Sequence, residues 1–201
     1  LKNDIAAAIT SFTNSISIKK DARTFNDRAS CYRLVDNNEL AIKDYITAIA
    51  LNSDLAFIYN NIASTYRNKG DPEKSLAYYS LAISKDSNYV LAYNNRASLY
   101  LNMNEIENAL YDIEKAISID NNYAPAYNNK AVIFHQRKEY KKALSYFDQA
   151  ISLTDDYGKA YLNRGITRQI LRDEDGACSD WLKAKELGIN VAKKYLVSDC
   201  N

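Results

Sequence analysis

Few residues of this chain have side chains that could do chemistry, and their spacing does not bring them together. The only histidine, His135, has no nearby cysteine with which to bind zinc. Cys31, Cys178 and Cys200 lack the C-x-x-C spacing of metal sites. A catalytic nucleophile needs an adjacent base, and the sequence around His135 supplies no such pair. We therefore expect no enzyme activity, no metal and no cofactor.

The acidic clusters have a simpler interpretation than paired catalytic carboxylates. Asp155 and Asp156, and the acidic run at 173–175, fall between predicted helices. Asp is favoured in such turns because its side chain hydrogen-bonds the local backbone and caps helices. The sequence also contains no glycine-rich nucleotide-binding loop.

The informative polar residues are asparagines that return at a fixed interval. The segments 59–63, 93–97 and 127–131 each place two asparagines after a tyrosine, and they are spaced 34 residues apart. Looser copies occupy 25–29 and 161–165 at the same interval. An interval of this length indicates a repeat architecture, so the asparagines recur once in each structural unit.

On a helix, these asparagines lie away from the tyrosine that begins each segment. With about 100° per residue, Ile62 and Ala63 fall within roughly 60° of Tyr59. Asn60 and Asn61 fall near about 100° and 200° and are expected to be exposed, so they should contribute little to folding. An exposed amide can donate to and accept from the main chain of an extended peptide. The predicted peptide-binding groove comprises Asn60, Asn61, Asn94, Asn95, Asn128, Asn129 and Asn163, with positive charge from Arg23, Arg67 and Lys159.

The elements that carry these residues are predicted to be helices. Five Gly and two Pro are too few to punctuate many strands and tight turns. Apolar residues spaced by three and four indicate an amphipathic helix over 3–18. We expect one domain over 1–201, built from a partial repeat (1–21), five helical hairpins (22–55, 56–89, 90–123, 124–157 and 158–191) and a C-terminal cap (192–201).

Residue size also repeats within the units. The fourth position is aromatic and the eighth is small, while small residues at the twentieth and twenty-seventh positions flank a large one at the twenty-fourth. In the fourth unit, for example, Ala143 and Ala150 flank Phe147. Small side chains let neighbouring helices approach, and large ones fill the space between them.

This pattern resembles the tetratricopeptide repeat over nearly the whole chain. The chain departs from the consensus of this repeat at three places. Ser75 is at the twentieth position of its unit, Arg168 is at the eleventh position of its unit, and no unit has proline at its thirty-second position. The resemblance implies an all-α fold, a right-handed superhelical solenoid of antiparallel helix pairs with a C-terminal capping helix. It also implies protein partners that bind as extended segments along a groove.

The cap is predicted as a short helix over 191–198 that presents Val191, Tyr195 and Leu196 to the last hairpin. If the cap folds back in this way, Cys178 and Cys200 come within reach of a disulfide bond. Two free thiols in a reducing compartment are the alternative.

Charge and hydropathy limit the classes of partner. A net charge of +1 lacks the basic excess of a nucleic-acid binder. No apolar run approaches the roughly 18 residues of a membrane-spanning helix, so membrane insertion is not expected. The cellular compartment stays open between cytoplasm and periplasm.

The function predicted from these observations is a non-catalytic scaffold for protein interactions that binds an extended peptide. One alternative is the targeting or substrate-selecting arm of a larger enzyme, which the start of the sequence halfway through a repeat favours. A second alternative is self-association through the terminal faces.

Overall fold

The computed structural model describes residues 2–200, and side chains from residue 4 onward. Within this range the chain forms twelve helices and no strand, so the predicted all-α repeat fold is confirmed. The helices are α1 (Lys2–Ile18), α2 (Ala22–Leu34), α3 (Asn38–Leu51), α4 (Ala56–Asn68), α5 (Pro72–Lys85), α6 (Val90–Asn102), α7 (Ile106–Ile119), α8 (Ala124–Gln136), α9 (Tyr140–Leu153), α10 (Gly158–Ile170), α11 (Glu174–Glu186) and α12 (Ala192–Asp199).

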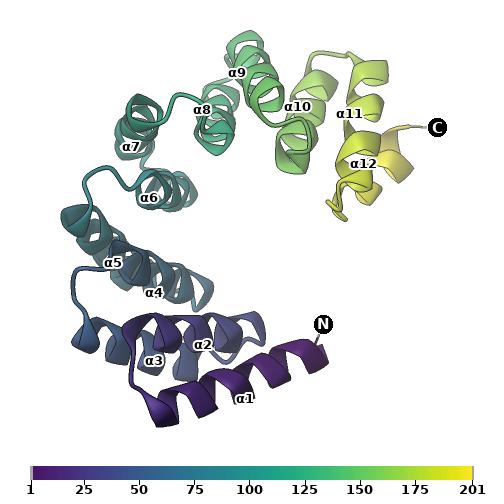
Figure 1. Cartoon of the computed structure of the whole chain (residues 1–201). Coiled ribbons are helices and arrows are strands. Elements are labelled where there is room, and N and C mark those ends of the chain that lie inside the picture. Colours follow the sequence, from purple (N-terminus) through teal and green to yellow (C-terminus); the bar gives the residue numbers. More distant parts are fainter. Residues whose placement is uncertain (1, 201) are drawn as a thin grey trace. The chain divides into compact units, whose positions relative to one another are not determined.

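The chain forms two compact units, residues 1–99 and 100–201, and the boundary between them falls within α6. In the first unit, α2 contacts α1 and α3, and α4 contacts α3 and α5 (Figure 1). In the second unit, α8 contacts α7 and α9, α10 contacts α9 and α11, and α12 contacts α11. The first helices of successive hairpins also touch, α2 with α4 and α8 with α10. Within each unit, neighbouring helices along the chain therefore pack on one another, as in a helical solenoid.

The repeated residue sizes correspond to the observed packing. The aromatic residues at the fourth position of the first four hairpins are at most 9% exposed, and the alanines at the eighth position are fully buried (Phe25, Tyr59, Tyr93 and Tyr127; Ala29, Ala63, Ala97 and Ala131). The last hairpin has Gly165 at the eighth position, where a Cβ atom would lie 2.6 Å from Nε1 of Trp181. Glycine is needed there because the largest side chain of the chain fills the twenty-fourth position.

Buried ion pairs join the two helices in α2/α3 and α10/α11. Nε of Arg28 lies 2.7 Å from Oδ2 of the buried Asp44. In α10/α11, Nη2 of Arg164 lies 2.6 Å from Oδ1 of Asp180, and Nη1 of Arg168 lies 2.9 Å from its Oδ2. Arg168 thus replaces the usual aromatic residue with a second cation for the same carboxylate.

The guanidinium of Arg164 is held firmly in its charged form. Burial alone would lower the pKa of Arg164, but its hydrogen bonds to Asp180 and Asp148 outweigh burial and raise that pKa. In α4/α5 and α8/α9, stacked rings occupy the corresponding place, with centroids 5.4 Å apart for Tyr66 and Tyr78. The two helices of a hairpin are therefore joined by an ion pair in α2/α3 and α10/α11, and by stacked aromatic rings in α4/α5 and α8/α9.

The turn inside every hairpin contains a left-handed residue at the fifteenth position. The five residues are Asp36, Gly70, Asn104, Lys138 and Arg172, with φ between 59° and 77°. Only glycine adopts this conformation without steric strain. All five hairpins therefore have the same turn conformation, although only one of them has glycine at this position.

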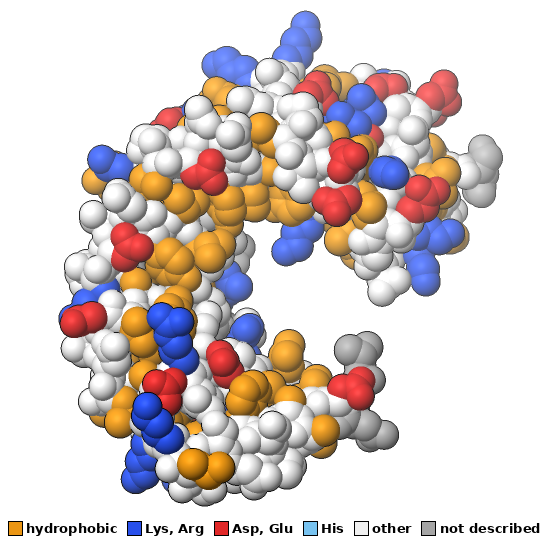
Figure 2. Space-filling model, viewed as in Figure 1, with side chains coloured by type: hydrophobic (Ala, Val, Ile, Leu, Met, Phe, Trp, Pro, Cys, Tyr) orange, Lys and Arg blue, Asp and Glu red, His pale blue; other side chains and the backbone are white. Residues whose placement is uncertain are grey.

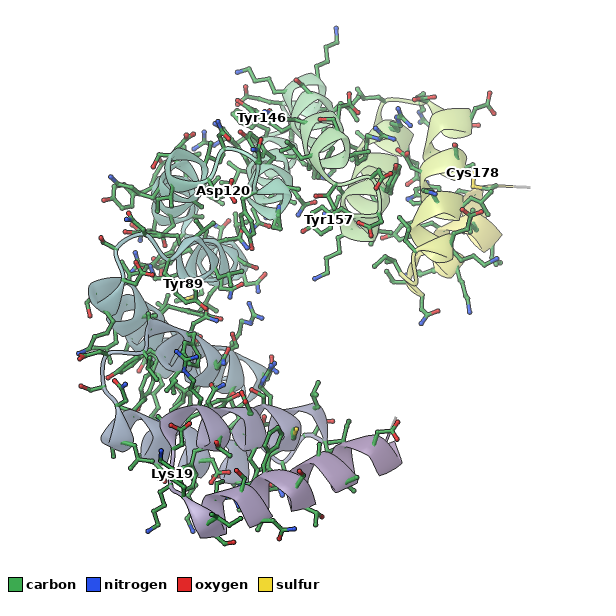
Figure 3. All side chains as sticks on the ribbon, in the orientation of Figure 1. Lys19, Tyr89, Asp120, Tyr146, Tyr157 and Cys178 are labelled. Carbon is green, nitrogen blue, oxygen red and sulfur yellow. A yellow bond between two sulfur atoms is a disulfide. The ribbon has the colours of Figure 1, made fainter. Side chains whose placement is uncertain are left out.

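The last hairpin is covered by α12, as the prediction of a capping helix requires. The Tyr195 ring stacks on Trp181 with centroids 5.0 Å apart. A disulfide bond joins Cys178 on α11, labelled in Figure 3, to Cys200, and their Cα atoms are 5.7 Å apart. The expectation that Val191 belongs to the packed stripe is wrong, because α12 begins one residue later and Val191 is 53% exposed.

Candidate functional site

The two asparagines of each pair occupy different environments. The fifth-position residues Asn26, Asn60, Asn94 and Asn128 are only 5–7% exposed. The sixth-position residues Asn61, Asn95, Asn129 and Asn163 are half-buried. In α4, α6 and α8, the first helix of the hairpin thus carries one buried amide and one amide that reaches the surface.

Hydrogen bonds connect these amides from one hairpin to the next. In the first unit, Nδ2 of Asn61 donates to Oδ1 of Asn26 over 2.9 Å. Nδ2 of Asn95 donates to Oδ1 of Asn60 over 3.0 Å. The second unit repeats this contact, with the Asn163 amide donating to Asn128 over 3.0 Å. The buried carbonyl oxygens are therefore satisfied, as folding requires.

The burial of the fifth-position asparagines differs from the sequence-based expectation that both amides are exposed. The helical wheel considers one helix and its own hairpin partner. In the structure, α2 also contacts α4, and α8 also contacts α10. The fifth position faces that additional neighbour, so the asparagines support the fold as well as forming part of the predicted groove. Their contact with a ligand stays a prediction.

The half-buried amides keep hydrogen-bonding capacity after these contacts are made. An asparagine side chain has two N–H donors and a carbonyl oxygen. The contact with the preceding hairpin uses one N–H of Asn61, Asn95 and Asn163. Within the described part of the chain, these three side chains show no other hydrogen bond. One N–H and one carbonyl oxygen of each are available in a fixed orientation.

The predicted basic residues lie on the first helices of three hairpins. Arg23 on α2 and Lys159 on α10 are exposed, and Arg67 near the end of α4 is half-buried. Among residues 4–200, none of the three forms an ion pair. Their charges are thus not neutralised by the chain itself.

His135 belongs to a hydrogen-bonded chain that joins α8 to α10. Its Nδ1 lies 2.9 Å from Oγ1 of Thr167, and that hydroxyl donates to the main-chain oxygen of Asn163. Because threonine has a single hydroxyl proton, Nδ1 of His135 is the donor and Nε2 of the neutral ring is an acceptor. Burial lowers the pKa of His135 below its ordinary value of 6.5, so the ring is neutral at pH 7.

A small pocket beside His135 contains residues that the sequence analysis did not single out. It has a volume of about 120 Å³ and is lined by Val132, His135, Phe147, Asn163 and Ile166. Val132 and Ile166 both occupy ninth positions, where the first three hairpins have serine. That change from serine to aliphatic residues was the available signal.

The charged and apolar character of the surface is mixed. Lysines and arginines lie among aspartates and glutamates over the face seen in Figure 2. No helix within residues 2–200 is both long enough and apolar enough to cross a membrane. Within the same described residues, no three His, Cys, Asp or Glu side chains are grouped as a metal ion would require.

Comparisons with known sequences identify a repeat family. Family models described as Tetratricopeptide repeat match residues 58–89, 90–123 and 124–157. These segments agree with three of the five hairpins predicted from the 34-residue interval. No curated protein matches the chain by sequence.

Solved structures are similar in fold at low sequence identity. A chain of the APC/C hetero-tetramer Cut9-Hcn1 aligns with a TM-score of 0.85 and 15% identity over 98% of this chain, which spans 39% of that chain. TTC0263, a thermophilic TPR protein of Thermus thermophilus, has a TM-score of 0.76 and 16% identity, covering 88% of this chain and 99% of its own. YrrB, described as a TPR protein with an unusual peptide-binding site, has a TM-score of 0.60 and 20% identity, covering 91% and 97%.

Proposed function

We propose that this chain, a tetratricopeptide repeat protein, is a non-catalytic scaffold that binds an extended segment of a protein partner. Stacked helical hairpins present surfaces assembled from the same positions of successive repeats, and such surfaces bind proteins. The asparagine series would form the part of the groove that contacts the main chain of the ligand.

The observation that supports this proposal most strongly is the fixed orientation of the half-buried amides. Asn61, Asn95 and Asn163 each use one N–H to bind the preceding hairpin and keep a carbonyl oxygen and a second N–H. The free pair matches the alternating N–H and C=O groups of an extended peptide. A ligand would bind without first having to order these side chains, which lowers the entropic penalty of binding.

The basic side chains add a preference for negatively charged partners. Arg23, Arg67 and Lys159 have no ion-pair partner among the described residues, so a carboxylate of the ligand can approach them. Exposed charges of this kind contribute more to the rate of association than to affinity, and their effect declines with salt.

The proposal also agrees with one of the structural relatives. YrrB is described as having a peptide-binding site, although its 20% identity to this chain shows a shared fold and no more. Peptide binding by the present chain therefore rests on its own asparagines.

The test begins with peptides selected from a displayed library of random nine-residue sequences. One enriched peptide, synthesised with blocked ends, is titrated into ¹⁵N-labelled protein while the asparagine side-chain amide signals are followed by NMR. We expect the signals of Asn61, Asn95 and Asn163 to shift together with one dissociation constant. The loop residues Asn121 and Asn122, which are exposed, serve as controls and should not move.

Enrichment of no peptide would refute the proposed function. So would a bound peptide that shifts the control signals and leaves the groove asparagines unchanged. Substituting the asparagines by alanine is a weaker test, because it would leave buried carbonyl oxygens such as that of Asn60 without a partner and would disturb folding.

A further inference from the structure

The residues at the ninth position of the repeat differ between the two units. In the first unit, the hydroxyl groups of Ser30 and Tyr45 lie 3.0 Å apart, and so do those of Ser64 and Tyr79. In the second unit, Val132 and Ile166 take the serine position. Both are half-buried, so part of their aliphatic surface reaches solvent.

That aliphatic surface lines a defined pocket rather than a flat face. Val132 and His135 come from α8, Asn163 and Ile166 come from α10, and the buried Phe147 comes from α9. All five residues belong to the second unit. The pocket includes Asn163, so it is continuous with the predicted peptide-binding groove.

The volume of the pocket fits a single side chain. Sites for drug-sized ligands and cofactors are usually about 300–1,000 Å³, whereas this pocket measures about 120 Å³. An apolar cavity of about 150 Å³ is known to hold benzene. A branched or linear group of three or four carbon atoms, as in Val, Leu, Ile or Met, therefore has a suitable size.

The polar groups of the pocket suit the main chain that would accompany such a side chain. Nε2 of the neutral His135 is an acceptor without a hydrogen bond within the described residues, because Nδ1 donates to Thr167. The Asn163 amide keeps one N–H and its carbonyl oxygen. These groups can pair with a peptide N–H and C=O beside the inserted side chain.

Charge indicates what lies next to the inserted residue. Lys159 is exposed on α10, one helical turn before Asn163. It forms no ion pair with any described residue of the chain. A ligand carboxylate a few residues from the pocket would supply the missing counter-charge.

We propose that this pocket selects ligands with an aliphatic side chain, and that Lys159 favours an acidic residue nearby. The proposal rests on the proposed peptide-binding function and specifies its ligand as an extended segment with one aliphatic anchor and an adjacent carboxylate. The pocket then acts as the specificity-determining part of the groove, while the asparagines hold the main chain of any sequence.

The probe is a pair of end-blocked nine-residue peptide pools, with leucine or serine fixed at the centre and the other positions randomised. Fluorescence anisotropy with wild-type protein should show at least about tenfold tighter binding of the leucine pool, or about 1.4 kcal/mol. The double variant Val132→Ser/Ile166→Ser should lose this preference and bind both pools as the wild type binds the serine pool. The matched control Leu182→Ser, an exposed aliphatic residue of α11 outside the pocket, should keep the preference.

A second pair of pools tests the charge. Both pools have leucine fixed at the centre, and one carries aspartate where the other carries asparagine. The aspartate pool should bind about two- to fivefold tighter, and Lys159→Ala should remove the difference. Circular dichroism of each variant verifies that it is folded.

The outcomes separate the pocket from the function on which it depends. If the leucine and serine pools bind measurably but equally, the proposal for the pocket is wrong and the proposed peptide-binding function stands. A preference for leucine that survives the double serine substitution also overturns the pocket. If neither pool binds, the proposed function fails and the pocket proposal fails with it.

Discussion

The hairpins of the two units bury a large side chain at the same position, but they differ in its polarity and in that of the residue beside it. In α2/α3 and α4/α5, a serine at the ninth position pairs its hydroxyl with that of a buried tyrosine, as Ser64 does with Tyr79. In α8/α9 and α10/α11, aliphatic residues take the ninth position, and Phe147 or Trp181 replaces the tyrosine. The large residue is at most 1% exposed in all four hairpins (Tyr45, Tyr79, Phe147 and Trp181).

The comparison shows that the fold constrains the size of the twenty-fourth residue more than its polarity. A tyrosine hydroxyl there needs a partner, which the ninth-position serine supplies, whereas the phenyl ring of Phe147 has no polar atom to pair. In these four hairpins the ninth residue is half-buried, so the same choice goes with a polar or an aliphatic surface beside it. In these four hairpins the polarity of the surface is thus linked to the core through two residues, whereas the remaining hairpin combines Ser98 with Ile113.

The largest expected effect concerns the ion pairs that the two units also share. Asp180→Ala leaves Arg164 and Arg168 without their buried carboxylate and should destabilise the fold by about 3–5 kcal/mol. Asp44→Ala should have a smaller effect, because the buried carboxylate of Asp44 pairs with one arginine and that of Asp180 pairs with two. Urea unfolding followed by circular dichroism measures both variants.

Asp148→Ala is the matched control for these variants. Asp148 also contacts Arg164, but its side chain is 58% exposed, and an exposed pair contributes about 1 kcal/mol at most. If Asp148→Ala and Asp180→Ala lowered the free energy of unfolding equally, burial would not account for the strength of the Asp180 ion pairs.

Phe147→Tyr tests the comparison from the apolar side. By analogy with Tyr45 and Ser30, the new hydroxyl would face Val132, which has no group to pair with it, and should destabilise the protein by about 1–3 kcal/mol. Adding Val132→Ser recreates the serine–tyrosine pair of the first unit and should recover most of this loss. Thermal unfolding of the single and double variants gives the coupling energy, and strict additivity would count against the pairing.

Tyr79→Phe tests the same pair from the polar side. Removing one hydroxyl should destabilise the fold by about 0.5–1.5 kcal/mol. Adding Ser64→Val converts the hairpin to the aliphatic type and should return stability to near the wild-type value, because neither partner is then left unpaired. A double variant that is less stable than Tyr79→Phe would show that the hairpins are not interchangeable. Denaturant midpoints are sufficient for this measurement.

The smallest effect concerns His135, which only the second unit has. Its pKa is lower in the folded protein than in the unfolded chain because of burial. The unfolded chain therefore takes up this proton first as the pH falls through about 6.5, so stability decreases from there down to the folded-state pKa and levels off below it. His135→Gln should show a smaller loss of stability than the wild type between pH 7.5 and 5.5. Identical losses in urea titrations would mean that burial does not affect the histidine.

The sequence predicted the repeated elements well, because its 34-residue interval depends on contacts that every hairpin makes. The burial of Tyr59 and Ala63, for example, follows from the pattern of one hairpin. The inward position of Asn60 does not, because it arises from a contact with the next hairpin that a single helical wheel omits. The pocket was missed for a related reason, since Phe147 reaches it from another helix.

The asparagine contacts between hairpins also bear on how such a chain can change its length. Asn60 accepts a hydrogen bond from Asn95 of the following hairpin, while Asn61 of the same hairpin donates to Asn26 of the preceding one. A hairpin of this kind carries one half of each bond, so its duplication or deletion as a whole 34-residue segment creates no unpaired buried amide. An insertion within the first helix that shifts the fifth and sixth positions would break that pairing. The polar contacts of the stack, like its apolar core, are therefore compatible with changes of length in steps of one whole repeat.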